Sequence, residues 1–496
     1  MTSATSRATT GRTRPVAAWL PLAVVLVTQM MIVLDAAIVN IALPDMQQAL
    51  NIHPADLSWV INAYTLAFGG LLLLGARAGD LFGRRTTFAA GMLLFTTASL
   101  LGGFATAPGQ LFAARAAQGV GAALVAPSAL AILMSLYTET KDRTRAIGYY
   151  TVVSASGAAV GLIAGGVLTS YVSWRWVMFV NVPIGALVLF ASRSALPKGQ
   201  FRRGKVDVLG ALLSTAGMTT LVYGFIRAAA DGWSDDGARL SFAVALLLLA
   251  AFVAVERRVS EPVTPLHLFA DRERSTAYVA RLLLVAGSMG SFFFLSQYFQ
   301  IVLGWSAMKT GLAFIPFPIT IFLSSQLATR VLVGRFGAKL VMAAGMALST
   351  IGLLMLAQMG AHSTYSELVV GMVVFALGNG TAFVPLTAAG IANVEPKDAG
   401  VASGLVNVTQ QLGGSVGLAV LVTVFATAGD GAATSAAATS KAKDIFVTGA
   451  DRGLLVAAVL LAASLALVLV AMRPARKQEA VVEKPAEQLV LEAEPA

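Results

Sequence analysis

Leu81–Leu94 reads LFGRRTTFAAGMLL, and a later stretch, Arg335–Leu348, reads RFGAKLVMAAGMAL. Both have Phe-Gly at their second and third positions, carry a basic residue two positions after the glycine, and continue with Ala-Ala-Gly-Met. The two residues of every matching pair are separated by the same number of positions along the chain. The sequence therefore predicts two parallel copies of a larger unit, each with this stretch between its second and third helices.

The composition indicates a membrane protein. The chain has 496 residues, of which 57% are hydrophobic and only 12% are charged, and its mean hydropathy is +0.77. Soluble domains carry about 25% charged residues. The chain has no cysteine, and its three histidines lie in polar or proline-flanked stretches between apolar runs. These counts exclude disulfides and predict neither a metal site nor a cofactor.

Long apolar segments recur along the chain, and each is long enough for a membrane-spanning helix of about 20 residues. We predict an all-α integral membrane protein with about fourteen spans, which are 19–43, 58–76, 87–105, 109–136, 146–170, 176–193, 207–228, 240–255, 276–302, 310–330, 338–360, 367–393, 400–427 and 454–472. The first is too long for a signal peptide and has no convincing cleavage site. The repeat leaves room for two six-helix bundles and two extra central helices.

The predicted domains follow from this division. They are an N-terminal tail (1–18), a first six-helix bundle (19–193), a linker with two added helices (194–268), a second six-helix bundle (269–472) and a C-terminal tail (473–496).

Basic residues gather in alternate loops, such as those around Arg84, Lys141, Arg202, Arg257 and Arg335. The positive-inside rule predicts that these loops and both termini are cytoplasmic. The net charge of +10 then reflects membrane topology and predicts no nucleic-acid partner. The Ala/Gly-rich composition is typical of a GC-rich bacterial genome, so we expect the bacterial plasma membrane.

Four motifs follow one another along the chain, namely LDAAIVNIALP (34–44), GDLFGRR (79–85), RAAQGVGAA (115–123) and GAAVGLIAGG (157–166). Together they resemble motifs of the major facilitator superfamily, in its fourteen-helix drug:proton antiporter branch (EmrB/QacA-like exporters). GDLFGRR resembles the loop signature, which acts as a cytoplasmic gate, through Asp80, Gly83, Arg84 and Arg85. GAAVGLIAGG resembles the antiporter motif of the fifth helix, through Gly157, Gly161, Gly165 and Gly166. RAAQGVGAA resembles the fourth-helix motif through Arg115, Gln118, Gly119 and Gly121, and LDAAIVNIALP resembles the first-helix motif.

The chain departs from the family pattern in three places. Ala76 replaces the first glycine of the loop signature, and Leu162 replaces the proline of the fifth-helix motif. The span 400–427 has no carboxylate, unlike some relatives. This last departure argues against divalent-cation transport and a two-proton scheme.

One carboxylate, Asp35, falls well inside a predicted span, where an aspartate costs between about 2.5 and 3.5 kcal/mol. Arg115 is the one deep basic residue. At 1.5 Å per residue, Asp35 lies about 12 Å and Arg115 about 9 Å from the same end of their spans. We therefore expect the two to pair directly or through water, and we interpret them as the proton-coupling residues, with a structural ion pair or a cation-binding charge as alternatives. Arg281 is expected to reach the cytoplasmic interface instead.

The resemblance implies proton-coupled efflux of amphipathic or cationic drugs or antibiotics by alternating access, with no enzymatic activity. The expected partners are such a small molecule, protons and the lipid bilayer. Residues proposed for the substrate cavity are Met30, Met31, Phe293, Phe294, Gln297 and Tyr298.

Three other classes of function compete with drug efflux. An uptake carrier or metabolite exporter of the same fold is the serious rival, because fold does not fix function. An ATP-driven pump is disfavoured because GQFRRGKV (199–206) ends in Val206 where a phosphate loop needs Ser or Thr. A membrane enzyme would need an acid–base or metal constellation that the sequence does not show.

Overall fold

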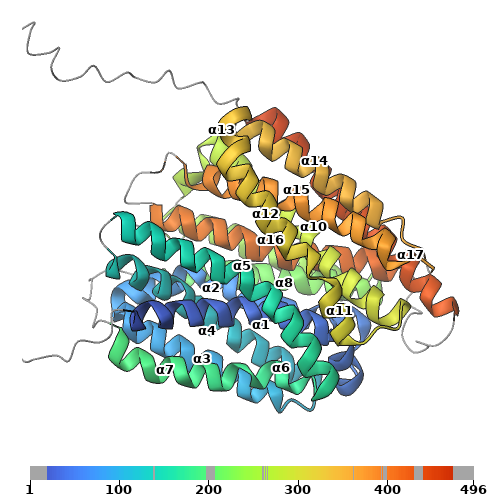
Figure 1. Ribbon diagram of the computed structural model, residues 1–496, viewed down its shortest axis with the longest axis horizontal. Helices are drawn as coiled ribbons and strands as arrows, with labels where there is room; N and C mark the ends of the chain where they lie inside the picture. The colour runs from blue at the N-terminus through green and yellow to red at the C-terminus, as the bar shows by residue number, and fades with distance from the viewer. Residues whose placement is uncertain are drawn as a thin grey trace, which may run out of the picture.

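The computed structural model describes residues 19–137, 140–196, 207–259, 262, 264, 266–360, 362–392, 394, 399–428 and 440–472, which form helices and connecting turns (Figure 1). The two predicted tails and the loop at 429–439 lie outside these ranges. The longer helices are α1 (Leu20–Leu50), α2 (Trp59–Phe82), α3 (Arg84–Gly103), α4 (Pro108–Leu136), α5 (Thr140–Tyr171), α7 (Asn181–Ala195), α8 (Val208–Asp231), α9 (Asp236–Glu256), α10 (Arg272–Gln297), α12 (Pro316–Leu327), α14 (Ala338–Leu356), α15 (Tyr365–Ile391), α16 (Ala399–Ala428) and α17 (Ser440–Ala471). Short helices extend or join them, namely α6 (Arg175–Phe179), α11 (Ala307–Ala313), α13 (Val333–Phe336) and the π-helical turns η3 (Tyr298–Val302) and η4 (Ala328–Leu332).

The predicted fold class is confirmed. Within the described residues, 13 helices or continuous helical segments are long and apolar enough to cross a membrane. Helix α5 supplies the fourteenth crossing with 32 residues, although its described apolar part, Ala159–Tyr171, is shorter. The last span begins earlier than predicted, because α17 continues as a helix through Asp451 and Arg452. These charges lower the local hydropathy without ending the helix, so a hydropathy window places its start too late.

The internal repeat is visible in the backbone. Gly83 (φ 89°) separates α2 from α3, and its counterpart Gly337 (φ 81°) separates α13 from α14. Both adopt a positive φ that other residues rarely take, which allows the sharp turn between two helices. The matched turns confirm that the two copies fold alike.

Glycines also set how closely the helices of each copy approach. A Cβ on Gly91 of α3 would lie 2.8 Å from the carbonyl oxygen of Gly121 in α4. A Cβ on Gly345 of α14 would lie 2.7 Å from the carbonyl oxygen of Gly378 in α15. Each pair of helices therefore contacts backbone to backbone, as small residues allow in membrane proteins.

The helices form two groups of six spans. In the N-terminal half, α1 packs on α5, α2 on α4, and α3 on α4 and α7. In the C-terminal half, α10 packs on α16 and α17, α14 on α15 and α17, and α12 on α15. The central hairpin, α8 and α9, lies outside both groups, and its α8 packs on α2 and α16.

We call the end of the molecule that carries the turns around Arg84, Arg257 and Arg335 the basic end. At the opposite end the two halves are joined by hydrogen bonds. Ser296 Oγ donates to the carbonyl oxygen of Asn40 (3.0 Å), and Gln300 Nε2 donates to that of Ile41 (3.1 Å). On the flank of α5 and α12 the helices of the two halves diverge toward the basic end (Figure 1). Along α2 and α16 the halves stay in contact in that direction, since a Cβ on Gly404 would lie 2.3 Å from Leu73 Cδ2. The structure therefore shows a conformation in which the halves meet at the non-basic end and along α2 and α16.

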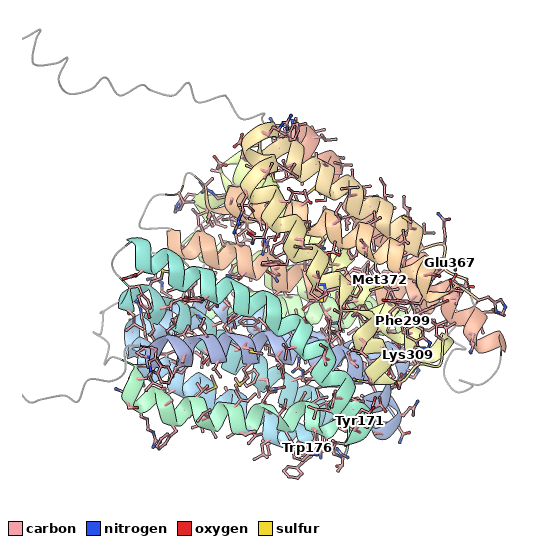
Figure 2. All side chains as sticks on the ribbon, in the orientation of Figure 1. Tyr171, Trp176, Phe299, Lys309, Glu367 and Met372 are labelled. Carbon is pink, nitrogen blue, oxygen red and sulfur yellow. The ribbon has the colours of Figure 1, made fainter. Side chains whose placement is uncertain are left out.

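A second contact at the same end joins α5 to α11. The backbone N–H of Met308 donates to Ser170 Oγ (2.9 Å). A Cβ on Gly166 would lie 2.7 Å from Met308 Cα, so this glycine allows the close approach. Figure 2 places Tyr171 and Lys309 near this contact, and Trp176 lies at the adjacent rim with its side chain pointing outward. Trp176 and Tyr171 are exposed, as aromatic residues of an interfacial belt would be.

Replacing Gly166 with leucine should push α5 and α11 apart. Overpacking costs about 1–3 kcal/mol, so the population of the closed contact should fall by a factor between about 5 and 150. The measurement is disulfide formation between Ser170→Cys and Met308→Cys, which is simple because the chain has no native cysteine. Gly109→Leu is the control, since a Cβ at Gly109 meets nothing within 4 Å. Equal crosslinking in both variants would contradict the role given to Gly166.

Candidate functional site

Asp35 lies midway along α1 and is fully buried, with no exposed surface. Its Oδ2 is 2.6 Å from Nη1 of Arg115 on α4, and Arg115 is also buried. The structure therefore brings the two deep charges together in direct contact. A charge-assisted bond of this length is strong, and it offsets the cost of placing either charge in an apolar interior.

Two amides complete the surroundings of the Asp35 carboxylate. Its Oδ1 accepts from Asn181 Nδ2 (2.8 Å) and from Gln118 Nε2 (3.2 Å). Gln118 Nε2 also donates to Ser99 Oγ (2.7 Å), and its Oε1 accepts from Arg115 Nη1 (2.9 Å). Because Arg115 and Gln118 are three residues apart, they share one face of α4.

Helix α2 also meets the pair. Arg115 Nε donates to the carbonyl oxygen of Val60 (2.9 Å), and the guanidinium carbon lies 4.5 Å from the centre of the Tyr64 ring. The approach is possible because a Cβ on Gly119 would lie 2.4 Å from the Tyr64 carbonyl oxygen. The Asp35 network therefore joins α1, α2, α3, α4 and α7, and breaking the ion pair would affect the whole N-terminal half.

The predicted gate residues lie at the basic end. Asp80 is in the last turn of α2, and Gly83 forms the turn to α3. Arg84 Nη1 donates to the carbonyl oxygen of Ala131 in α4 (3.1 Å), and Arg85 donates to that of Arg193 at the end of α7. These bonds fix the turn against its own half of the molecule.

The glycines of the fifth-helix motif face two different neighbours. A Cβ on Gly157, Gly161 or Gly165 would meet α1 near Val33, Leu34 or Ile38, respectively. Gly166 instead faces α11 of the other half. The glycine stripe of α5 (Gly157, Gly161 and Gly165) therefore brings α5 close to α1, which carries Asp35. The last glycine of the motif, Gly166, belongs to the contact between the halves.

The residues proposed for a substrate cavity do not form one surface in this conformation. Phe294 stacks on Phe425 (5.5 Å between ring centres), and Tyr298 donates to the carbonyl oxygen of Gly360 (2.6 Å). Both side chains are completely buried within the C-terminal half. Hydropathy identified the helix but not its rotation, and these two side chains face the neighbouring helices of their own bundle.

The other four proposed cavity residues have varied surroundings. Met31, Phe293 and Gln297 are buried, and Met30 is half-buried. A pocket of about 470 Å³ lies elsewhere, at the non-basic end. Its lining residues include Asp45, Gln300, Trp305 and Lys443.

Sequence reasoning missed Arg281. It was expected to extend to the basic interface, but it is only 3% exposed. Its Nη2 donates to Gln410 Oε1 (2.8 Å), its Nη1 donates to Thr387 Oγ1, and its Cζ lies 4.1 Å from the centre of the Phe383 ring. The missed signal was the Thr and Gln on the neighbouring helices α15 and α16, whose positions only the fold reveals.

The family comparison matches residues 25–418 to the Major Facilitator Superfamily. The chain is 43% identical to the puromycin resistance protein pur8 of Streptomyces alboniger over 415 residues, which cover 82% of this chain and 81% of that protein. It is 39% identical to the cephamycin export protein CmcT of Amycolatopsis lactamdurans, over 86% of this chain and 88% of that protein. It is 35% identical to the lincomycin resistance protein of Streptomyces lincolnensis, over 85% and 87% of the two chains.

Two solved structures show a similar arrangement of helices. The nucleoside transporter NupG aligns with a TM-score of 0.64 at 12% identity, over 92% of this chain and all of that one. An auto-inhibited peptide transporter of the POT family aligns with a TM-score of 0.65 at 14% identity, over 92% and 98% of the two chains. At these identities the comparison concerns the fold alone.

The ion pair makes a specific prediction about stability. Asp35→Leu or Arg115→Met should each lower the free energy of unfolding by about 3–5 kcal/mol, because each leaves a buried charge without its partner. The double variant should lose less than the sum of the two. Denaturant unfolding of the protein in detergent measures the coupling.

The exposed pair Asp236–Arg239 (3.7 Å) provides the matched control. Asp236→Leu and Arg239→Met should change the free energy of unfolding by less than about 1 kcal/mol each and show no coupling. Simple additivity at Asp35 and Arg115 would mean that the two charges do not stabilise each other.

Proposed function

The chain belongs to the Major Facilitator Superfamily, and from this premise we propose that it exports amphipathic drugs or antibiotics, cationic ones included, in exchange for protons. The observation that carries the proposal is the buried Asp35–Arg115 pair in the N-terminal half. The names of the relatives support the direction of transport, since they describe antibiotic resistance and export.

Proton coupling follows from what protonation would do to the network. A protonated Asp35 no longer attracts the Arg115 guanidinium, so the bond that joins α1 to α4 is weakened. Proton uptake would then favour a different arrangement of these helices, and proton release would restore the observed one. The buried Tyr64 hydroxyl and Asn181 Oδ1, which have no partner among the described residues, are polar groups that a proton route could use.

The energy available from one proton is adequate for export. Moving one elementary charge through 100 mV is worth about 2.3 kcal/mol, which supports a roughly fifty-fold gradient of a substrate without net charge. The protein needs no ATP in this scheme.

We propose that the basic end faces the cytoplasm, in agreement with the positive-inside rule. The observed conformation is then inward-facing on the flank of α5 and α12, because there the halves meet at the opposite end and diverge toward the basic one (Figure 1). Asp80, Arg84 and Arg85 would bias the inward gate, and the stripe Gly157–Gly165 would let α5 move against α1. The domain boundaries 19–193, 194–268 and 269–472 are part of the same proposal, with α8 and α9 outside the transport path.

Export and its energy source are tested in an efflux-deficient bacterial host. Cells that carry the protein should accumulate several-fold less ethidium than control cells, and a protonophore should abolish the difference. Greater accumulation would instead indicate an uptake carrier. A difference that survives the protonophore would contradict proton coupling.

The coupling residue is tested with purified protein. Asp35→Asn preserves the shape of the side chain and an acceptor oxygen for Arg115, so we expect it to fold but to release no proton when the exported dye binds in detergent. Asp236→Asn, at an exposed position, should release protons as the wild type does. Normal release from Asp35→Asn would leave Asp35 a structural role only.

Topology is tested by cysteine labelling in intact cells. Ser435 lies outside the described residues, in the segment between α16 and α17, which is external in the proposed topology. Ser435→Cys should therefore react with an impermeant maleimide. Gly334→Cys, at the basic end, where a Cβ meets nothing within 4 Å, should react only after permeabilisation. The reverse pattern would invert the proposed orientation.

A further inference from the structure

We propose that Arg281 binds a carboxylate of the exported molecule, so that the substrates include acidic and zwitterionic amphiphiles. The inference rests on the proposed function, and it assigns a substrate class to the C-terminal half. In this inference Arg281 is the positive group that recognises the ligand, whereas the buried carboxylate of Asp35 is already paired with Arg115.

The described residues that contact the Arg281 guanidinium are polar or aromatic, and none of them is acidic. Thr387 on α15 and Gln410 on α16 accept from the two terminal nitrogens, and the Phe383 ring lies beneath the guanidinium. The buried Nε has no acceptor among the described residues. At least one of the five N–H donors, the Nε–H, is therefore unused among the described residues, in a site with little access to water.

Arg281 differs in this respect from the other deeply buried arginine at a membrane depth, Arg115. Arg115 has a carboxylate at 2.6 Å, whereas no Asp or Glu among the described residues lies within ion-pair distance of Arg281. Two neutral acceptors and one aromatic face compensate a buried positive charge only in part. An arginine retains its charge under these conditions, so a carboxylate that entered the site would be strongly attracted.

The site is also next to the seam between the halves. Thr387, Phe383 and Gln410 are half-buried, whereas the guanidinium between them is covered. The residue after Gln410, Gln411, packs on Gly69 of α2, which belongs to the N-terminal half. A ligand that replaced either neutral acceptor would therefore be bound where α16 meets α2, the contact that alternating access must rearrange.

The net charge of the buried side chains indicates the same class of substrate. The charges of Asp35 and Arg115 cancel each other. Among these three buried side chains, Arg281 therefore contributes a net positive charge. An inside-negative membrane potential also favours outward movement of an anion, by roughly fifty-fold per charge and 100 mV. A carboxylate-bearing molecule thus complements both the site and the driving force.

The experiment compares two probes, dansyl-phenylalanine and its methyl ester, of which only the first carries a carboxylate. Their affinities for the purified full-length protein in neutral detergent are measured by fluorescence titration. We expect the wild type to bind the acid about tenfold or more tightly than the ester, since a charge-assisted hydrogen bond contributes at least that factor. Arg281→Gln should bind the two probes equally, and Arg281→Lys should retain part of the preference.

Arg239→Gln is the matched control, because that arginine is 62% exposed and should not alter the preference. Equal affinity for the two probes in the wild type, or failure to bind the acid, overturns the proposal without reference to any variant. A preference that survives in folded Arg281→Gln overturns it as well.

Two further arms separate the sources of a carboxylate effect. In the first arm, phosphatidylglycerol is added to the detergent micelles at constant detergent concentration. If the lipid abolishes binding of the acid and the acid does not displace the lipid, the site binds lipid headgroups and the substrate assignment is wrong. A retained preference for the acid in a protein that exports nothing from cells would refute the proposed function but leave the site intact.

Discussion

Burial of Asp35 is the constraint on which the N-terminal half depends. A carboxylate in an apolar interior is stable only when its charge and both its oxygens are compensated. Here the compensation comes from α4, through Arg115 and Gln118, and from α7, through Asn181. The arginine is in turn held by α2. The position of one side chain thus fixes the mutual rotation of several helices, and any change in its charge must change their packing.

The two halves have the same construction but different internal charges. Matched glycines at the turns and between helices give both copies the same backbone geometry. The N-terminal half then contains a closed ion pair, whereas the C-terminal half contains an arginine among neutral acceptors. Under the two proposals made above, one half would respond to protons and the other would recognise a ligand, although both have the same fold.

Much of this arrangement could be predicted from the sequence. Hydropathy gave the number of spans, because a membrane helix needs a minimum apolar length. The repeat LFGRR/RFGAK gave the duplication, and equal depth along two spans indicated the Asp35–Arg115 pair before any contact was known. Helix rotation was beyond reach, as Phe294 and Tyr298 show, because an apolar helix is apolar on all its faces and its sequence does not distinguish them. Arg281 was misjudged for a related reason. Its distance from the helix end is compatible with an extended side chain, and only tertiary packing decides that it turns inward.

The central hairpin breaks the symmetry of the molecule in the membrane plane. Helix α8 packs on both α2 and α16, and Thr423 of α16 donates to the carbonyl oxygen of Phe225 in α8 (2.7 Å). On the other side of the molecule, α5 meets α11 and α12 with no comparable covering helix among those described. Lipids therefore contact the seam between the halves along one flank and a helical hairpin along the other, so the bilayer has two unequal interfaces with a protein built from equivalent halves.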